Sequence, residues 1–249
     1  MKKLKFLAIL LLILSLCSSL CFGESNLTFD GNDNIRNSNG ISGIDVDART
    51  QTAWFQCDSF TGIHTIMMDA SAISAGNSAF RWACAAEAGS NIIDISYRWT
   101  TTSGNWDAGT VSGSTWIFGF TTYDRGTTTN DPTFLNNCVS QTITEDATPN
   151  GTAKTGVDSM TIGENVGGTE DLIGDLAFAT HYAVAIPSVL CGDMMYKPGS
   201  VVDSMKMFWL LMDTGTQKDL SGNGADGTVT GTTASLAGPP IMFGGGLPL

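Results

Sequence analysis

Bulky apolar residues fall on alternate positions in one stretch of the chain, from Leu172 to Ile186. Smaller or more polar residues stand between Leu172, Leu176, Phe178, Tyr182, Val184 and Ile186. A period of two places these two sets on opposite faces of an extended strand, whereas a helix needs apolar residues three and four apart. The pattern therefore predicts a long central strand over Leu172–Ile186, with Leu176, Phe178 and Tyr182 on one face.

Shorter runs of the same kind recur along the chain and are separated by turns rich in Gly, Asn and Asp. They predict strands at Leu27–Asp30, Arg49–Cys57, Ile63–Asp69, Ala79–Ala86, Asn91–Trp99, Ser114–Asp124, Thr133–Val139, Asp158–Gly163 and Met205–Met212. Pro187–Tyr196 predicts one or two helical turns, and the polar stretches Thr100–Gly113 and Thr144–Gly156 predict loops. This order predicts an all-β protein, an antiparallel two-sheet jelly-roll sandwich with a short C-terminal helix.

The N-terminus carries three lysines, an apolar run over Phe6–Leu14 and the small residues Cys21 and Gly23. This is typical of a secretory signal peptide spanning residues 1–23, followed by one domain at 24–237 and a flexible tail at 238–249. The alternative is an uncleaved anchor, but the apolar run is shorter than the ~20 residues of a membrane span. We therefore expect a secreted or cell-surface protein, periplasmic or virion-associated locations included, without a permanent membrane span.

The chain is acidic, with 24 Asp and Glu against 12 Lys and Arg, three of which lie in the predicted leader. Such a surface repels phosphate backbones, so we expect no nucleic-acid partner. Four cysteines follow the leader: Cys57, Cys84, Cys138 and Cys191. Export favours disulfides, but four thiols allow three pairings, and buried free thiols are the alternative.

Motifs for hydrolysis are missing from the sequence. Neither paired carboxylates with an E-x-D-x-x-E spacing nor a G-x-S-x-G elbow occurs, and Glu145-Asp146 and Glu170-Asp171 have the wrong spacing. Arg81, Arg98 and Tyr97 offer the residue types of a polysaccharide lyase without a distinctive motif. His181 is expected to be a packed histidine with one hydrogen bond, and His64 a surface strand residue. The sequence therefore favours a protein without catalytic activity.

Several segments together resemble the laminin G-like branch of the concanavalin A-like lectin and glucanase superfamily, in the type found in phage and environmental sequences. They are LTFDGNDN at the start, TAWFQC, WIFGFTTYDRG, TFLNN, and finally MTIG followed by GDLAFATHYAVAIP. The resemblance implies a jelly roll, often with a structural Ca²⁺ and a glycan-binding role. It implies that any bound ion lies near Asp30 or Asp175, although Ala177 stands where the family frequently has an acidic residue.

Two polar turns could supply further oxygen ligands for Ca²⁺, one with Asp30, Asn32 and Asp33 and the other with Asp219, Asn223 and Asp226. Neither has the full spacing of a Ca²⁺ loop. Each is also well suited to forming a tight turn through its Asn and Asp side chains.

Trp106 is the best candidate for stacking on a sugar ring, because it stands alone in a stretch of Ser, Thr and Gly. We expect it to be exposed, with Asn105 and Asp107 as hydrogen-bonding neighbours for sugar hydroxyls. The alternative is that its ring packs into the core.

The function predicted from the sequence is that of an exported, non-catalytic jelly-roll module that binds carbohydrate or another surface ligand. One alternative is a polysaccharide hydrolase or lyase of the same fold. Another is a structural decoration or assembly subunit of a virion or cell surface.

Overall fold

The structure, a computed structural model, describes residues 26–37, 40–69, 80–87, 90–154, 159–164, 170–235 and 238–239. The predicted leader 1–23 and nearly all of the predicted tail lie outside these residues. Within the described part, no helix is long and apolar enough to cross a membrane.

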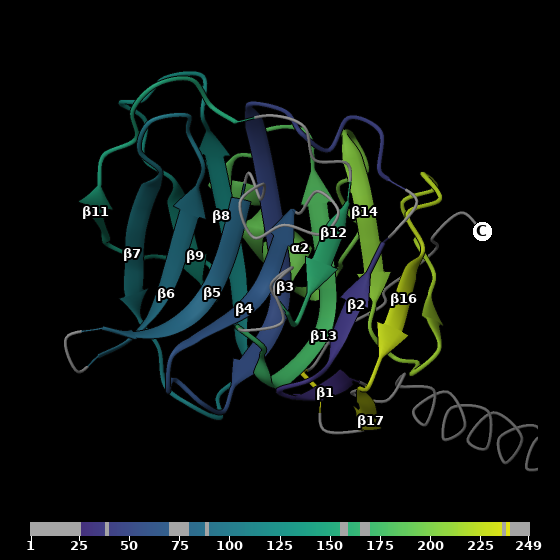
Figure 1. Cartoon of the computed structure of the whole chain (residues 1–249). Coiled ribbons are helices and arrows are strands. Elements are labelled where there is room, and N and C mark those ends of the chain that lie inside the picture. Colours follow the sequence, from purple (N-terminus) through teal and green to yellow (C-terminus); the bar gives the residue numbers. More distant parts are fainter. Residues whose placement is uncertain are drawn as a thin grey trace, which may run out of the picture.

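The described residues form two antiparallel sheets, with the strands of sheet B in front of those of sheet A in Figure 1. Sheet A has the order β10-β9-β8-β3-β13-β1-β17, and β14 also pairs with β13. Its strands are β1 (Asn26–Asp30), β3 (Ala48–Cys57), β8 (Ile117–Asp124), β9 (Thr133–Asn136), β10 (Val139–Ser140), β13 (Ile173–Tyr182), β14 (Met205–Leu210) and β17 (Thr233–Ser235).

Sheet B has the order β11-β7-β6-β5-β4-β12-β2-β16-β15. Its strands are β2 (Asn34–Arg36), β4 (Ile63–Asp69), β5 (Phe80–Glu87), β6 (Ser90–Tyr97), β7 (Gly104–Thr110), β11 (Ile143–Ala147), β12 (Met160–Ile162), β15 (Thr216–Gln217) and β16 (Gly227–Thr230). This arrangement confirms the predicted antiparallel jelly-roll sandwich.

The main core lies between the two sheets and follows from the alternation within each strand. In β6, for example, Ile93, Ile95 and Tyr97 point into this core, so Asp94 and Ser96 between them face outward. A disulfide between Cys57 of β3 and Cys84 of β5 joins the two sheets through the core.

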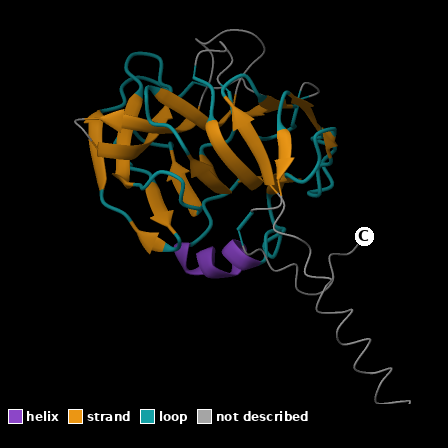
Figure 2. Cartoon of the chain, turned by 90° about the horizontal axis from the view of Figure 1, so that it is seen from below, coloured by secondary structure: helices purple, strands orange, loops and turns teal. Residues whose placement is uncertain are grey.

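A second apolar layer covers the outer face of sheet A. There the 3₁₀ turn η1 (Ser188–Leu190) and helix α2 (Cys191–Tyr196) pack over side chains of β3, β8 and β13. Figure 2 shows this helical segment outside the two layers of strands. The Trp54 indole donates a hydrogen bond to the Met195 carbonyl at 2.9 Å, and a disulfide joins Cys138 to Cys191. Both the predicted helical turns after Pro187 and a disulfide framework are therefore present, and the alternative of free thiols is wrong.

The predicted central strand is present as β13, but it ends at Tyr182 and not at Ile186, and its three bulky residues do not share one face. A register shift against β3 falls between Leu176 and Phe178, so Ala177 is an extra residue in the strand. Leu176 consequently faces the main core, whereas Phe178 and Tyr182 face the layer under α2. This is the effect of a β-bulge, which re-aims every side chain beyond it.

The two predicted loops are also partly wrong. Thr100–Gly113 contains the strand β7, and Thr144–Gly156 contains most of β11, which forms the edge of sheet B beside β7.

Candidate ligand-binding face

The outer face of sheet B carries a strip of polar side chains across its strands. In β7, Trp106 and Ala108 point into the core, so Asn105 and Asp107 point outward. The register places Asn105 opposite Ser96 and Asp107 opposite Asp94 on β6. The row of Asn105 continues through Arg81 on β5 and Met68 on β4 to Thr161 on β12, and the row of Asp107 continues through Ala83 on β5 to Thr65 on β4. The structure thus brings Asn105 and Asp107 together with residues that the sequence did not single out as a group.

Arg81 is the centre of an ion network on this face. Its Nη2 donates to Asp94 at 2.8 Å and its Nη1 to Glu170 at 2.9 Å. Burial opposes the charge of Arg81, but Asp94 and Glu170 outweigh it and raise the Arg81 pKa above its ordinary value. Burial raises the pKa of Asp94, against the lowering effect of Arg81, and Glu170 and Asp146 raise it further. One guanidinium therefore serves two carboxylates.

Several polar atoms near this network have no hydrogen-bond partner within the described part of the chain. They are the Nε of Arg81 and the hydroxyls of Thr65 and Thr161. Thr65 is fully buried and Thr161 is 2% exposed. Buried polar groups are normally satisfied, so these atoms mark a place where a ligand or water could supply the missing bonds.

Trp106 is not the exposed platform that its sequence context predicts. Its side chain is fully buried in the main core, where its ring contacts Tyr97 and Tyr123 at centroid distances of 6.3 and 5.4 Å. Its indole donates a hydrogen bond to Asp131 at 2.8 Å. The prediction of exposure is wrong because β7 is a strand, and Trp106 takes one of its inward positions.

The predicted metal residues lie on neighbouring strands of sheet A. Asp30 is exposed at the end of β1, and Asp175 on β13 is opposite Thr28 of β1. One carboxylate oxygen of Asp175 already accepts hydrogen bonds from Asn26 at 2.7 Å and Thr28 at 2.5 Å. No group of three or more His, Cys, Asp or Glu among the described residues could hold a metal ion. A Ca²⁺ site at Asp30 or Asp175 gains no support and stays a prediction.

The turn after Lys218 is organised by its own carboxylate. Asp219 accepts hydrogen bonds from the backbone amides of Phe208, Ser221, Asn223 and Ala225 at 3.0–3.1 Å. The Ser221 hydroxyl adds a further bond at 2.7 Å. This carboxylate holds the turn and the adjoining strand β14 together, which is the structural role that the sequence left open.

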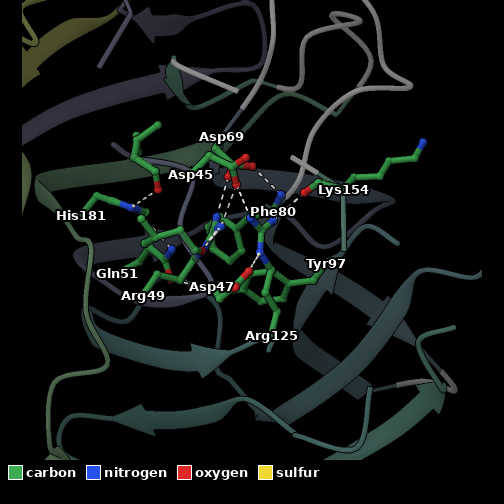
Figure 3. Close-up of polar contacts among 12 residues, drawn as sticks. Asp45, Asp47, Arg49, Gln51, Asp69, Phe80, Tyr97, Arg125, Lys154 and His181 are labelled. Carbon is green, nitrogen blue, oxygen red and sulfur yellow. Dashed lines mark hydrogen bonds and ion pairs between the residues drawn. The ribbon is translucent and has the colours of Figure 1, made fainter. Parts of the chain in front are cut away.

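A buried charged cluster closes one end of the sandwich (Figure 3) and was not predicted. Arg49, fully buried on β3, donates to Asp69 at 2.7 Å and to Asp45 at 3.0 Å. Asp45 also accepts from Arg125, which bonds the Lys154 carbonyl at 2.6 Å. Burial opposes the charge of Arg49, but Asp69 and Asp45 outweigh it and raise its pKa. Buried charges are retained only when paired in this way, and the pairing clamps the loop before β3 onto the sandwich.

His181 lies beside this cluster and is fully buried on β13. Its Nε2 donates to the Ile44 carbonyl at 3.1 Å, because a carbonyl can only accept, and its Nδ1 therefore accepts from Gln51 at 3.3 Å. Burial, followed by the nearby Arg49, lowers the His181 pKa from 6.5 to about 3. The predicted packed histidine is confirmed, with two polar contacts in place of one.

The remaining catalytic candidates are not assembled into a site. Tyr97 is buried in the main core, and burial raises its pKa, whereas Arg81 lies on the opposite, outer face of sheet B. The proposed lyase set is thus divided between two faces. His64 is not a surface residue: it is 6% exposed, and its Nδ1 contacts the Asp171 carbonyl at 2.6 Å.

No protein-family model and no curated protein sequence matches the chain. The solved structures it resembles include a "putative carbohydrate binding protein" from Bacteroides ovatus, with a TM-score of 0.62 and 17% identity. That match covers 89% of this chain but only 62% of the Bacteroides protein, so this chain spans less than two thirds of its length.

Two further structures share the sandwich. The heptameric SAP-like pentraxin of Limulus polyphemus matches with a TM-score of 0.53 and 11% identity, over 69% of this chain and 81% of the pentraxin. The enzymatically active domain of tailspike protein 2 of bacteriophage CBA120 matches with a TM-score of 0.53 and 13% identity, over 75% of this chain and 29% of that chain. At these identities the likenesses show the fold alone, an antiparallel two-sheet jelly roll, and leave function to the site.

Proposed function

We propose that this protein is an exported, non-catalytic module of laminin G-like type that binds carbohydrate on the outer face of sheet B. The observation that carries the proposal is the polar strip in which Asn105 and Asp107 adjoin Ser96, Asp94 and Arg81. Fixed amide, hydroxyl and carboxylate groups on a rigid sheet are suited to the directional hydrogen bonds of sugar hydroxyls.

The contrast between the two outer faces supports this choice. The outer face of sheet A holds an apolar layer under η1 and α2, whereas the outer face of sheet B displays the Arg81 network and Asn105. The fold shared with the Bacteroides protein, which is described as a putative carbohydrate binding protein, agrees with a glycan as the ligand. The two disulfides agree with an oxidising, extracellular location. Structural Ca²⁺ remains part of the proposal as a prediction.

Removing Asn105 or Asp107 tests the site. We expect Asn105→Ala and Asp107→Ala each to weaken glycan binding by about 1 kcal/mol, roughly fivefold, since each removes a hydrogen-bonding side chain. Both side chains are half-buried on the sheet surface, so the melting temperature should change little. The measurement is a glycan array followed by titration calorimetry of the best ligand, with and without EDTA.

Asp203→Ala is the matched control, because Asp203 is exposed and lies beside the α2 layer on the other side of the sandwich. Binding that is unchanged in both site variants would reject the outer face of sheet B as the site. Cleavage of the bound glycan, followed by chromatography, would instead favour the enzyme alternative.

A further inference from the structure

Resting on the proposed function, we infer that the outer face of sheet B selects glycans with free amino groups and rejects acidic ones. The inference comes from the charge balance around Arg81. Its single guanidinium bonds both Asp94 and Glu170, so this triad retains one negative charge. Asp146 is close enough to act electrostatically on Asp94, and it adds a further carboxylate.

The Arg81 network disfavours an acidic sugar. An arginine that recognises a uronate or a sialic acid uses its two terminal nitrogens as a fork. In Arg81 each of these nitrogens already donates to a carboxylate, and the remaining Nε is buried, so the guanidinium offers an acidic sugar no fork of two free nitrogens. Such a sugar would also approach the two carboxylates at close range, and the partial burial of these groups weakens solvent screening of that repulsion.

An ammonium group meets the opposite situation. Asp94 and Glu170 have side chains that are 16% and 24% exposed, so a ligand can reach them from solvent. Each carboxylate can accept more hydrogen bonds than its contact with Arg81 uses. A protonated amine placed there would neutralise the excess charge of the triad.

The unpartnered hydroxyls on the same face provide a second and independent reason for a sugar. Thr65 lies on β4, in the outward row that continues through Ala83 to Asp94, and the neighbouring row contains Thr161 and Arg81. Both hydroxyls are more than nine-tenths buried and have no partner among the described residues. Each can donate and accept a hydrogen bond, and because neither is exposed, a sugar bound at the Arg81 network would reach them through a bridging water.

The test compares three oligosaccharides of equal length by calorimetry in mildly acidic buffer: chitosan oligomers with free amines, chitin oligomers with acetylated amines, and oligogalacturonate. We expect the chitosan oligomer to bind at least about tenfold more tightly than the chitin oligomer, and oligogalacturonate not to bind. Added salt should narrow the difference between the first two, because it screens the charge attraction.

The variant Asp94→Asn removes one carboxylate of the triad and leaves Arg81 paired with Glu170. It should reduce the preference for free amines to about threefold or less, whereas Asp203→Asn makes the same change of net charge at a distant site and should leave the preference intact. If both variants lose the preference for free amines equally, the preference comes from the overall charge of the protein, and the inference is overturned. Equal affinity for chitin and chitosan, or firm binding of oligogalacturonate, would overturn it while leaving carbohydrate binding in place. Binding of no glycan at all would remove the proposed function itself.

Discussion

At the scale of single residues, Trp106 shows why the candidate site could be predicted only in part. The stretch around it reads as a loop because Thr, Ser and Gly dominate its composition. The informative signal is the alternation of Gly104, Trp106 and Ala108 with the polar Asn105 and Asp107. A side chain at Gly104 would meet the indole at 2.1 Å, so the glycine makes room for the ring. Asn105 and Asp107 could be predicted as site residues from the sequence. Which residues of β5 and β6 lie next to them depends on strand register, which the sequence does not show.

Truncation of Trp106 should be a stability defect. We expect Trp106→Ala to lower the free energy of unfolding by about 3–5 kcal/mol, as is usual for loss of a buried indole. Trp106→Phe should cost less, since it keeps much of the ring packing, although it loses part of the indole volume and the bond to the exposed Asp131. Urea unfolding monitored by circular dichroism provides the measurement. A loss below about 1 kcal/mol for the alanine variant would contradict the burial of Trp106.

His181 should make the protein sensitive to acid. Its folded pKa is about 3 against 6.5 for an ordinary histidine, so the folded state holds it neutral while the unfolded state takes up a proton below pH 6.5. Its stabilising contribution is therefore present above pH 6.5 and is lost as the pH falls towards 3, by about 1.4 kcal/mol per pH unit.

The variant His181→Gln cannot take up this proton. We expect its free energy of unfolding to fall less steeply than that of the wild type between pH 6.5 and 4, in urea titrations at several pH values. Parallel curves for the two proteins would show that His181 is not held neutral by the fold.

At the scale of elements, period-two alternation identified most strands, and the main error lies inside the best of them. Two correct alternating runs in β13 are joined through Ala177, and a pattern read along one strand cannot reveal a residue that the partner strand lacks. The bulge gives β13 a role in both apolar layers, with Leu176 in one and Phe178 in the other. Short edge strands such as β11 were not predicted, because polar residues occupy both of their faces and obscure the alternation.

The disulfide between Cys138 and Cys191 should stabilise the packing of α2 on the outer face of sheet A. The double variant Cys138→Ser/Cys191→Ser opens a loop with a sequence separation of 53, and we expect it to cost about 4 kcal/mol from the chain entropy of the unfolded state. Because α2 has only six residues, it cannot persist as a helix without its packing. The variant should also expose the apolar layer around Trp54.

Thermal unfolding and binding of the dye ANS measure these two effects. The variant Cys57→Ser/Cys84→Ser is the comparison, since it opens a loop with a separation of only 27 at the seam between the sheets. If the Cys138 and Cys191 variant keeps wild-type stability and does not bind the dye, the disulfide has no part in holding α2.

At the scale of the whole molecule, the sequence predicted the fold class from the succession of strands and turns, but it could not predict their order in space. Pairing β13 with β3 and β1, or Cys57 with Cys84, joins residues far apart in the chain, and local patterns carry no information on such contacts. The same limit applies to Arg49 and Asp69, which look like two ordinary strand residues until the fold buries them together.

The pairing of β1 with β17 has a mechanical consequence. Asn26 at the start of β1 pairs with Ser235 at the end of β17, so a pull applied at these two residues acts across the ladder and not along it. Hydrogen bonds loaded in this direction break one at a time, and β17 should peel away at low force. The two disulfides then cap the extension, because the chain between Cys57 and Cys84 and between Cys138 and Cys191 cannot lengthen. Under tension the protein would therefore extend by a short length at low force as β17 detaches, while the disulfide-linked sandwich stays folded until the force is higher.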